Sequence, residues 1–381
     1  MTTTNRPYAI CARCVMDTTD VEIQFDGDGI CNHCHAFAQM APRFLWSEER
    51  SRRELPLLIE RIRADGRRRE YDCVIGVSGG VDSTYVAYAA AELKLRALPV
   101  HLDNGWDSAL AVSNIKRTMD RLGFDLFTEV LDWDEFRDLQ LAFLKASTPD
   151  SEVPTDHAIL AVLLHQARQR GIKHIFFGGN FASEGILPKS WSQGGRDWTY
   201  IRGVHARFGT GPLRSFPHLS VPESILLQTG VLGPRWLRWL DYIQYNKTQA
   251  MDRLKSELGW EYYGGKHHES VYTRFFQSYI LPVKFNIDKR KAHLSSLINA
   301  GELSRKQALK ALEAPICPPE VIHEDREYVK KKFGLSEDEF EAIMALPRRT
   351  IRDYPHFENG PAWRFLSAVQ KKLSPSRAEK K

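Results

Sequence analysis

The chain has 381 residues, of which 43% are apolar and 27% charged, and its formal net charge is +5. This length suffices for two or three domains with buried cores, and the composition is that of an ordinary soluble protein. The apolar runs are too short to span a membrane and the first ten residues lack a signal-peptide core, so we expect a cytoplasmic location. The mild positive charge permits an anionic substrate but does not require nucleic acid, which we do not expect as a partner.

Four of the six cysteines lie in the first 34 residues, as two C-x2-C pairs separated by 16 residues: Cys11, Cys14, Cys31 and Cys34. This spacing is typical of a structural site in which four thiolates surround one metal ion. Between the pairs, alternating apolar residues precede a Gly-Asp-Gly turn, which predicts a hairpin that brings the pairs together. We expect zinc, and an iron–sulfur cluster is the alternative because four thiolates suit either. Basic, helix-compatible residues from 42 to 70 follow, and Gly66 is expected to close that helix.

Residues 71–84 predict a strand, a glycine turn and the start of a helix in direct succession. The strand, 72–77, is rich in valine and isoleucine, and SGGVDS follows it before a helix-compatible stretch at 84–95. Glycines let the backbone approach phosphate oxygens, and the N–H groups and dipole of a helix start attract an anion. Asp82 would repel phosphate alone, so we interpret it as a ligand of Mg²⁺. The stretch predicts a nucleotide site that is neither a Walker A loop nor a G-x-G-x-x-G dinucleotide turn.

Further apolar runs at 97–102, 125–130 and 173–177 alternate with helical stretches at 108–122, 133–145 and 155–169. This alternation predicts an α/β fold with a doubly wound parallel sheet, in which ligands collect at the carboxyl ends of the strands. A core position is the alternative for His101, and a loop cap for Asp103. The predicted ATP-binding residues are those at three strand ends: Val77, Ser78, Gly79, Gly80, Val81, Asp82, Ser83, His101, Asp103, Gly178, Gly179 and Asn180.

Residues 181–217 lack clear periodicity and are rich in glycine, aromatic residues and arginine, so we expect an inserted substrate loop without regular structure. Aromatic rings suit sugar faces and arginines suit phosphates, and we expect Lys189, Arg196 and Arg202 to contact substrate. Residues 235–258 predict a helix with tryptophans on one face.

A second polar cluster extends from residue 264 to 291. We expect Lys266, Lys284 and Lys289 to act with Asp82 in catalysis, because lysines neutralise a triphosphate as pyrophosphate leaves. A solvated basic surface is the alternative. We also expect His267 and Arg274 to contact substrate. The rest of the chain is predicted to be helical, including a helix at 305–314 capped by Ser304, before a disordered tail at 371–381. The expected parts are a metal module (1–45), a catalytic domain (46–290), a helical region (291–370) and the tail.

The joint presence of CARC and CNHC, SGGVDS, GGN and GGKHHESVYTRFFQ resembles the N-acetyl sugar amidotransferases, PP-loop proteins of bacterial surface-polysaccharide and flagellin-sugar biosynthesis. The resemblance extends to about residue 315. It implies a fold like that of the adenine-nucleotide α-hydrolases with an N-terminal zinc-ribbon-like module. It also implies that ATP adenylylates the oxygen of an N-acetyl group on a nucleotide-activated sugar, and that ammonia then displaces AMP to leave an acetamidino group. The implied cofactors are ATP, Mg²⁺ and structural Zn²⁺.

The source of the ammonia is a separate question, because a glutaminase needs a cysteine nucleophile with a histidine partner. Thr2 follows Met1, Cys73 lies in the strand before the PP-loop, and Cys317 stands among prolines without an obvious partner. We therefore expect a separate glutaminase subunit, as in the family. The alternative function is PP-loop tRNA thiolation, which would need further cysteines beside the nucleotide crevice. A scaffold with a degenerate nucleotide domain is a third alternative, which the intact Asp82 and Ser83 disfavour.

Overall fold

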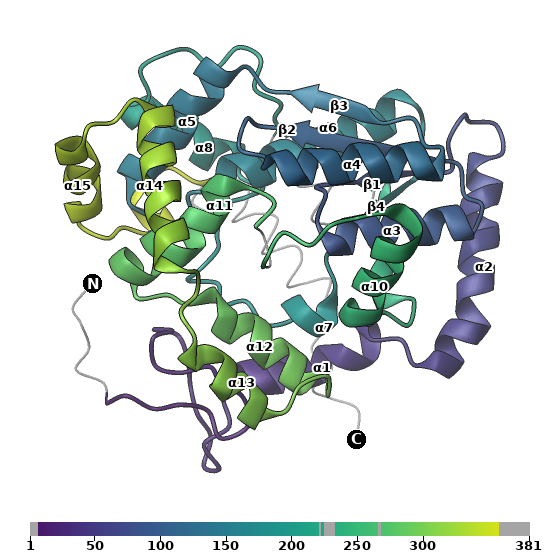
Figure 1. Cartoon of the computed structure of the whole chain (residues 1–381), viewed down its shortest axis with the longest axis horizontal. Coiled ribbons are helices and arrows are strands. Elements are labelled where there is room, and N and C mark those ends of the chain that lie inside the picture. The colour runs from purple at the N-terminus through teal and green to yellow at the C-terminus, as the bar shows by residue number, and fades with distance from the viewer. Residues whose placement is uncertain (1–6, 221, 225–232, 266–267, 358–381) are drawn as a thin grey trace.

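The computed structural model describes residues 7–220, 222–224, 233–265 and 268–357, and its centre is a parallel sheet (Figure 1). The five strands follow the order β3-β2-β1-β4-β5, and every neighbouring pair is parallel. Their bounds are β1 (Cys73–Gly76), β2 (Ala97–Asp103), β3 (Phe127–Val130), β4 (His174–Phe177) and β5 (Arg235–Arg238). This confirms the predicted doubly wound α/β class.

Helices cover both faces of the sheet because the side chains of each central strand point alternately to one face and the other. Cys73 and Ile75 of β1 pack in one apolar cluster with α3 (Val81–Glu92). Val74 between them packs in another cluster with α6 (Val153–Gln169). A strand covered on both faces has no polar side, which explains its continuous apolar run.

Most remaining elements are helices, and several begin at the caps that the sequence predicts. Ser108 accepts a hydrogen bond from Ala111 N at the start of α4, and Ser304 forms a capping box with Gln307 at the start of α13. The bounds are α1 (Asn32–Phe44), α2 (Glu48–Gly66), α4 (Ala109–Leu122), α5 (Trp133–Ala146), α7 (Phe181–Glu184), α8 (Trp198–Phe208), the 3₁₀-helix η1 (Trp239–Asp241), α10 (Lys247–Leu258), α11 (Val271–Phe275), the π-helix η2 (Phe276–Phe285), α12 (Lys289–Asn299), α13 (Arg305–Glu313), α14 (Pro319–Phe333), α15 (Glu337–Ala345) and the 3₁₀-helix η3 (Ile351–Asp353). In the described ranges, no helix combines the length and apolar character needed to cross a bilayer.

The single helix predicted over 235–258 is wrong in its first part, where the chain forms β5 and η1 before α10. β5 pairs in parallel with the whole of β4, from His174 to Phe177. Trp239 then stacks on Phe176, with ring centroids 4.3 Å apart. The hydrogen bonds to a neighbouring strand override the helical spacing of the tryptophans, because such spacing describes only local preference.

Two further expectations are corrected. The segment 181–217 contains α7 and α8, and Asp197 caps α8 by accepting a bond from Tyr200 N at 3.0 Å. In the cysteine module, the predicted hairpin is much shorter than expected: a single antiparallel bridge, Phe25–Cys31, spans the Gly-Asp-Gly turn, and a second isolated bridge joins Ile10 and Asp17. Aspartates 17, 20 and 26 accept nearby backbone N–H groups there, and these local turns compete with strand pairing. The predicted tail at 371–381 lies outside the described residues.

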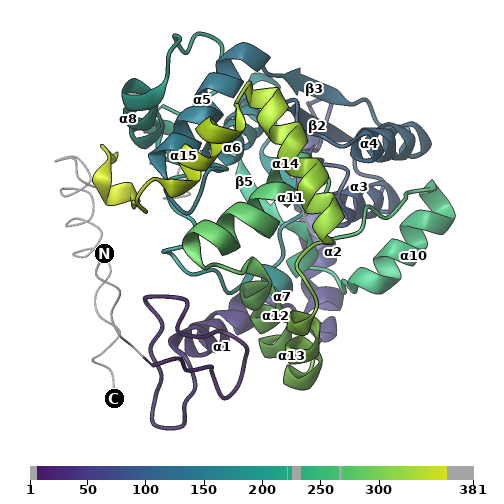
Figure 2. The same ribbon diagram turned by 60° about the vertical axis from the view of Figure 1, so that its left-hand side comes forward.

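The cysteine module lies against helices from the far end of the chain. Figures 1 and 2 both show α12 and α13 beside α1 and the coils that precede it, and α1 contacts α12. α12 also packs on α7, which directly follows β4, and His293 Nδ1 of α12 lies 3.1 Å from Ser183 O of α7. α12 therefore lies between the cysteine module and the carboxyl end of a central strand.

Candidate active site and metal centre

The SGGVDS turn leaves the carboxyl end of β1 and enters α3 at Gly80. The Ser83 hydroxyl closes the turn: its Oγ accepts from Ser78 N at 3.1 Å and donates to Gly80 O at 3.2 Å. Gly79 has a φ of +77°, and a Cβ there would lie 2.7 Å from Ala111 O. Only glycine therefore fits this position, and the turn presents its backbone at the N-terminus of a helix, as an anion site requires.

Three aromatic residues that the sequence interpretation missed contact this turn. Val81 N donates to Tyr263 Oη at 3.0 Å, and Trp260 Nε1 donates to Gly79 O at 3.0 Å. The Tyr245 hydroxyl donates to Asp82 Oδ1. Burial raises the pKa of Tyr263, so its hydroxyl stays neutral, and it accepts the bond from a helix N–H group that would otherwise face a phosphate oxygen.

The other predicted strand ends meet this turn in different ways. A Cβ on Gly178 would lie 2.7 Å from Ser83 N, so the end of β4 touches the first turn of α3. His101 links the end of β1 to the loop after β2, with its Nδ1 3.0 Å from Val77 O and its Nε2 3.1 Å from Asp107 Oδ2. Although burial opposes the charged form, Asp107 raises the pKa of His101.

Two predicted ligand residues also serve as local caps. Asp103 Oδ1 accepts from Gly105 N at 2.8 Å, and Asn180 Oδ1 accepts from Ser183 N at 2.9 Å at the start of α7. In the structure, Asp103 therefore has the role of a loop cap, which was the alternative to nucleotide binding. The polar strand ends still lie at one edge of the parallel sheet, where a nucleotide would bind.

A buried acidic pair lies behind this edge, at the start of α6, and the sequence interpretation missed it. Glu152 accepts from Gln140 Nε2 at 3.2 Å and from Thr273 Oγ1 at 2.5 Å. Burial raises the pKa of Glu152 to about 8 and also raises the pKa of Asp150, whereas the positive charge of Lys289 opposes both shifts. Lys289, a predicted catalytic residue, therefore lies close to these acids.

The remaining predicted residues are distributed over several regions. Lys284 is buried and donates to Ile343 O, which ties η2 to α15. Arg274 forms a two-pronged ion pair with Asp325, with both N–O distances at 2.7 Å. Arg202 is exposed on α8. The structure therefore does not bring these three side chains to the SGGVDS turn. Lys189 and Arg196 line a separate cavity, and residues 266 and 267, which include the predicted Lys266 and His267, lie outside the described ranges.

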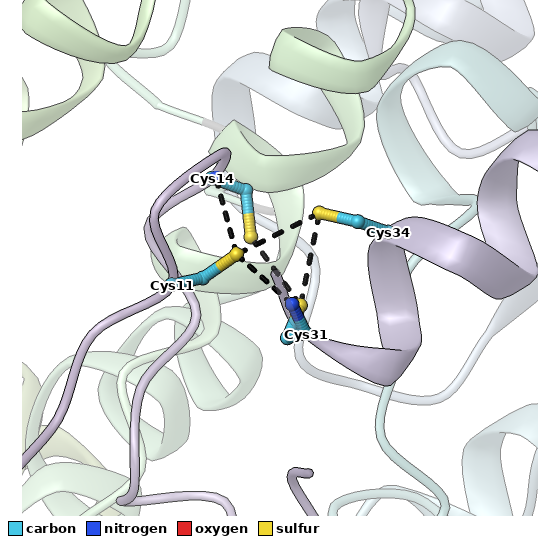
Figure 3. Close-up of side chains that lie close together, drawn as sticks. All are labelled: Cys11, Cys14, Cys31 and Cys34. Atoms are coloured by element: carbon cyan, nitrogen blue, oxygen red, sulfur yellow. Dashed lines mark hydrogen bonds between the residues drawn. The ribbon is translucent and has the colours of Figure 1, made fainter. Parts of the chain in front are cut away.

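The four N-terminal cysteines converge on one point (Figure 3). Their sulfur atoms all lie within 4.8 Å of one another, with Cys14–Cys31 and Cys31–Cys34 at 3.7 Å and Cys11–Cys34 at 3.9 Å. Tetrahedral zinc with Zn–S bonds of about 2.3 Å requires sulfur separations of about 3.8 Å. Hydrogen bonds from Cys31 and Cys34 lower the pKa of Cys14, which favours the thiolate. The donor set fits zinc, and four sulfurs leave no position open for a substrate.

Groups from both ends of the chain surround these sulfurs. Backbone N–H groups of Cys14 and Cys31 point at Cys11 Sγ, at 3.4 and 3.2 Å. Asn299 Nδ2 of α12 donates to Cys34 Sγ at 3.3 Å. Arg305 of α13 donates to Cys14 O and Cys11 O, each at 3.0 Å. The donors to sulfur stabilise thiolates, and the bonds from Arg305 fix the backbone that carries two of the cysteines, so the C-terminal helices support the candidate metal site.

Comparison with known proteins identifies the C-terminal part of the chain. Residues 269–370 match the family described as "LPS biosynthesis protein WbpG-like, C-terminal domain". For this part of the chain, the match confirms the resemblance to LPS-biosynthesis proteins. An uncharacterized protein of Methanocaldococcus jannaschii is 24% identical over 322 residues, which cover 83% of this chain and 97% of that protein.

Two solved structures show weak likeness. The NMN synthetase from Francisella tularensis has a TM-score of 0.29 and 16% identity, over 56% of this chain and 87% of its own. The NH3-dependent NAD synthetase from Campylobacter jejuni, in complex with the nitrate ion, has a TM-score of 0.28 and 13% identity, over 78% of this chain and 98% of its own. At TM-scores this low, the likeness supports no conclusion about function.

Proposed function

We propose that this chain, which carries a WbpG-like domain of LPS biosynthesis, is an ATP-dependent amidotransferase that converts an N-acetyl group of a nucleotide-activated sugar to an acetamidino group. One observation carries the proposal: the WbpG-like segment begins at the edge of the SGGVDS turn. Ser108 N donates to Glu269 O at 2.8 Å, and Val271 N donates to Trp106 O at 2.9 Å. A sugar-biosynthesis domain thus joins the loop after β2, beside the predicted nucleotide site.

In this mechanism, the backbone N–H groups from Gly79 to Val81 and the Ser78 hydroxyl would receive the phosphates of ATP, while Ser83 Oγ keeps the turn closed through Ser78 N and Gly80 O. The Asp82 carboxylate, with hydroxyl oxygens beside it, has the oxygen donors that Mg²⁺ prefers, and the ion would neutralise charge on the leaving pyrophosphate. Tyr263 must turn away for a phosphate oxygen to take its bond from Val81 N. Catalysis then consists mostly of positioning and charge stabilisation.

The reaction has two displacements. The oxygen of the acetamido group attacks the α-phosphorus of ATP, the bond to the β-phosphate oxygen breaks, and pyrophosphate leaves. Ammonia then adds to the activated carbon, the C–O bond breaks, AMP leaves with the former amide oxygen, and a proton is released as the amidine forms. Among the described lysines of residues 264–291, Lys289 is the candidate to stabilise the departing phosphates, since Lys284 donates to Ile343 O and Lys291 is paired with Asp17.

We propose that the ammonia comes from a separate glutaminase. Cys73 and Cys317 are both buried, and burial raises the pKa of each thiol. Among the described residues, no histidine is hydrogen-bonded to either sulfur. A nucleophilic thiolate is therefore disfavoured at both positions.

A product assay tests the proposal. Purified protein is incubated with Mg-ATP, an ammonium salt and a panel of N-acetylated nucleotide sugars, and products are identified by mass spectrometry. The proposal predicts AMP, pyrophosphate and a sugar in which NH replaces oxygen, and it predicts none of them with the Asp82→Asn variant. AMP formation that requires tRNA and a sulfur donor, and no panel sugar, would instead establish tRNA thiolation.

A further inference from the structure

A cavity of about 690 Å³ lies between the first half of α6 and residues 189–197. Residues 351–357 also line it, and so does Glu22 of the cysteine module. Pockets that enclose small-molecule ligands have volumes of about 300–1,000 Å³. None of the SGGVDS residues lines this cavity, so it is a second site beside the predicted nucleotide crevice.

The cavity holds positive charges that lack partners. Lys189, Arg196 and Arg352 line it, and within the described part of the chain none of them is hydrogen-bonded or ion-paired to another residue. An unpaired arginine is a preorganised donor for phosphate, because its planar guanidinium can form two parallel bonds to phosphate oxygens.

A buried histidine provides an independent sign of a ligand. His356 lines the same cavity with only 9% of its surface exposed, and its Nε2 is buried without a hydrogen-bond partner among the described residues. Leaving a buried polar atom unpaired costs about 1–3 kcal/mol. A ligand oxygen or hydroxyl in the cavity would satisfy it.

The wall that carries Lys189 and Arg196 is held in place. His157 of α6 donates from Nδ1 to Gly195 O at 3.1 Å and accepts from Leu219 N at its Nε2, at 2.9 Å. Burial lowers the pKa of His157 to about 4, so the ring stays neutral and keeps both bonds at physiological pH. The cavity is therefore built into the fold, rather than formed by an unsupported loop.

The acidic residues of the cavity indicate what else the ligand carries. Glu22 and Asp156 line it with the three cations, and so does Asp197, which accepts from Tyr200 N and Phe357 N, at 3.0 and 2.7 Å. Carboxylates repel phosphates but accept hydrogen bonds from hydroxyl groups. A cavity that combines cations with carboxylates suits a ligand with both phosphates and sugar hydroxyls better than a free polyphosphate.

The cavity adjoins the edge of the sheet through two contacts. Thr155, which precedes the cavity residue Asp156, accepts from Asn104 Nδ2 after β2 at 3.2 Å. Ser192 lines the cavity and donates to Asp150 Oδ2 at 2.6 Å, and Asp150 lies close to the charge of Lys289. A ligand held in the cavity can therefore extend past the first turn of α6 toward the predicted catalytic edge.

We propose that this cavity binds the nucleoside diphosphate part of the sugar substrate. Lys189, Arg196 and Arg352 contact the two phosphates, and His356 Nε2 bonds an oxygen of the same ligand. The carboxylates of Glu22 and Asp156 accept from its hydroxyls. This assignment rests on the proposed function and adds to it the site and the diphosphate linkage of the substrate.

The test measures binding of UDP, GDP and TDP to the full-length protein by calorimetry, with a saturating non-hydrolysable ATP analogue present to fill the SGGVDS site. We expect one of the three to bind, and Arg352→Ala and Lys189→Ala each to weaken it about 10-fold or more, since a charge-assisted bond contributes about 1.5–3 kcal/mol. Arg61→Ala is the matched control: this exposed arginine of α2 lies outside the cavity, and its loss should leave binding unchanged.

Two outcomes overturn the assignment: no diphosphate binds, or the one that binds does so equally well to Arg352→Ala and Lys189→Ala. The outcomes for the proposed function are separate. If amidine forms and the KM for nucleotide sugar is unchanged in both variants, the cavity assignment fails while the amidotransferase proposal stands. If a diphosphate binds in the cavity but no amidine forms with any panel sugar, the cavity assignment stands and the amidotransferase proposal fails.

Discussion

Replacing Gly178 with alanine tests whether the carboxyl end of β4 and the SGGVDS turn form one rigid unit. The added Cβ would lie 2.7 Å from Ser83 N and 3.0 Å from Asp82 C, both in the backbone of the first turn of α3. Ordinary contact begins near 3.4 Å, so strand and helix must separate by several tenths of an ångström. Gly178 does not have a positive φ, and the substitution therefore tests packing without backbone strain.

Overpacking of this kind costs about 1–3 kcal/mol. In a chain of this size, we expect the melting temperature to fall by about 1–4 °C. Because the displaced atoms belong to the phosphate-binding turn, AMP-forming turnover should fall further, by about 100-fold for a shift approaching 1 Å. The measurements are thermal unfolding and AMP release from ATP.

The control is Gly27→Ala, because a Cβ there meets no atom within 4 Å and the residue lies in the cysteine module. We expect this variant to unfold and turn over like the wild type. A Gly178→Ala protein with wild-type melting temperature and turnover would refute the reasoning, because it would show that β4 and α3 can move apart without loss of stability or activity.

Three further predictions concern side chains. Asp82→Asn should abolish AMP formation without changing the melting temperature, and unchanged turnover would contradict the PP-loop assignment. Cys14→Ser should lose bound metal, measured by elemental analysis, and solubility; a soluble variant with wild-type metal content would disprove the four-cysteine site. Glu152 has an ordinary pKa of 4.5 and a folded pKa of about 8, so the folded state retains a proton that the unfolded state releases. The free energy of unfolding should therefore fall as pH rises from about 4.5 through about 8. Denaturant titrations at pH 5 and pH 9 should show a smaller difference in this free energy for Glu152→Gln than for the wild type. An equal difference in the two proteins would show that Glu152 is charged when folded.

The features that the sequence predicted are those encoded locally. The glycines of the SGGVDS turn and the apolar run of β1 identify a strand, turn and helix within fourteen residues. Ser304 and Gln307 define a helix start by their spacing alone. The cysteine spacing needs no knowledge of the intervening fold, because the metal geometry itself requires the two pairs to meet.

The parts that escaped prediction depend on partners distant in sequence. Tyr263 and Trp260 reach the turn from more than 180 residues away, and their own segment carries no sign of that contact. Lys284 and Lys289 stand five residues apart in one basic segment. Lys284 is buried by the packing of η2 against α15, whereas Lys289 begins α12 and lies near the buried acids. Sequence composition does not distinguish such neighbours, because burial is a property of the fold.

α12 connects the four-cysteine cluster with the candidate active site. Near one end, Lys289 lies close to the buried acids, and Lys291 pairs with Asp17 of the cysteine module at 2.5 Å. In the middle, Ser295 Oγ accepts from Val15 N at 3.2 Å, and at the other end Asn299 donates to a cysteine sulfur. A metal held by all four sulfurs would take no part in the chemistry, but its loss would weaken the cysteine module that contacts this helix. Metal removal is therefore expected to displace Lys289 and to lower turnover together with stability, even though substrate never reaches the metal.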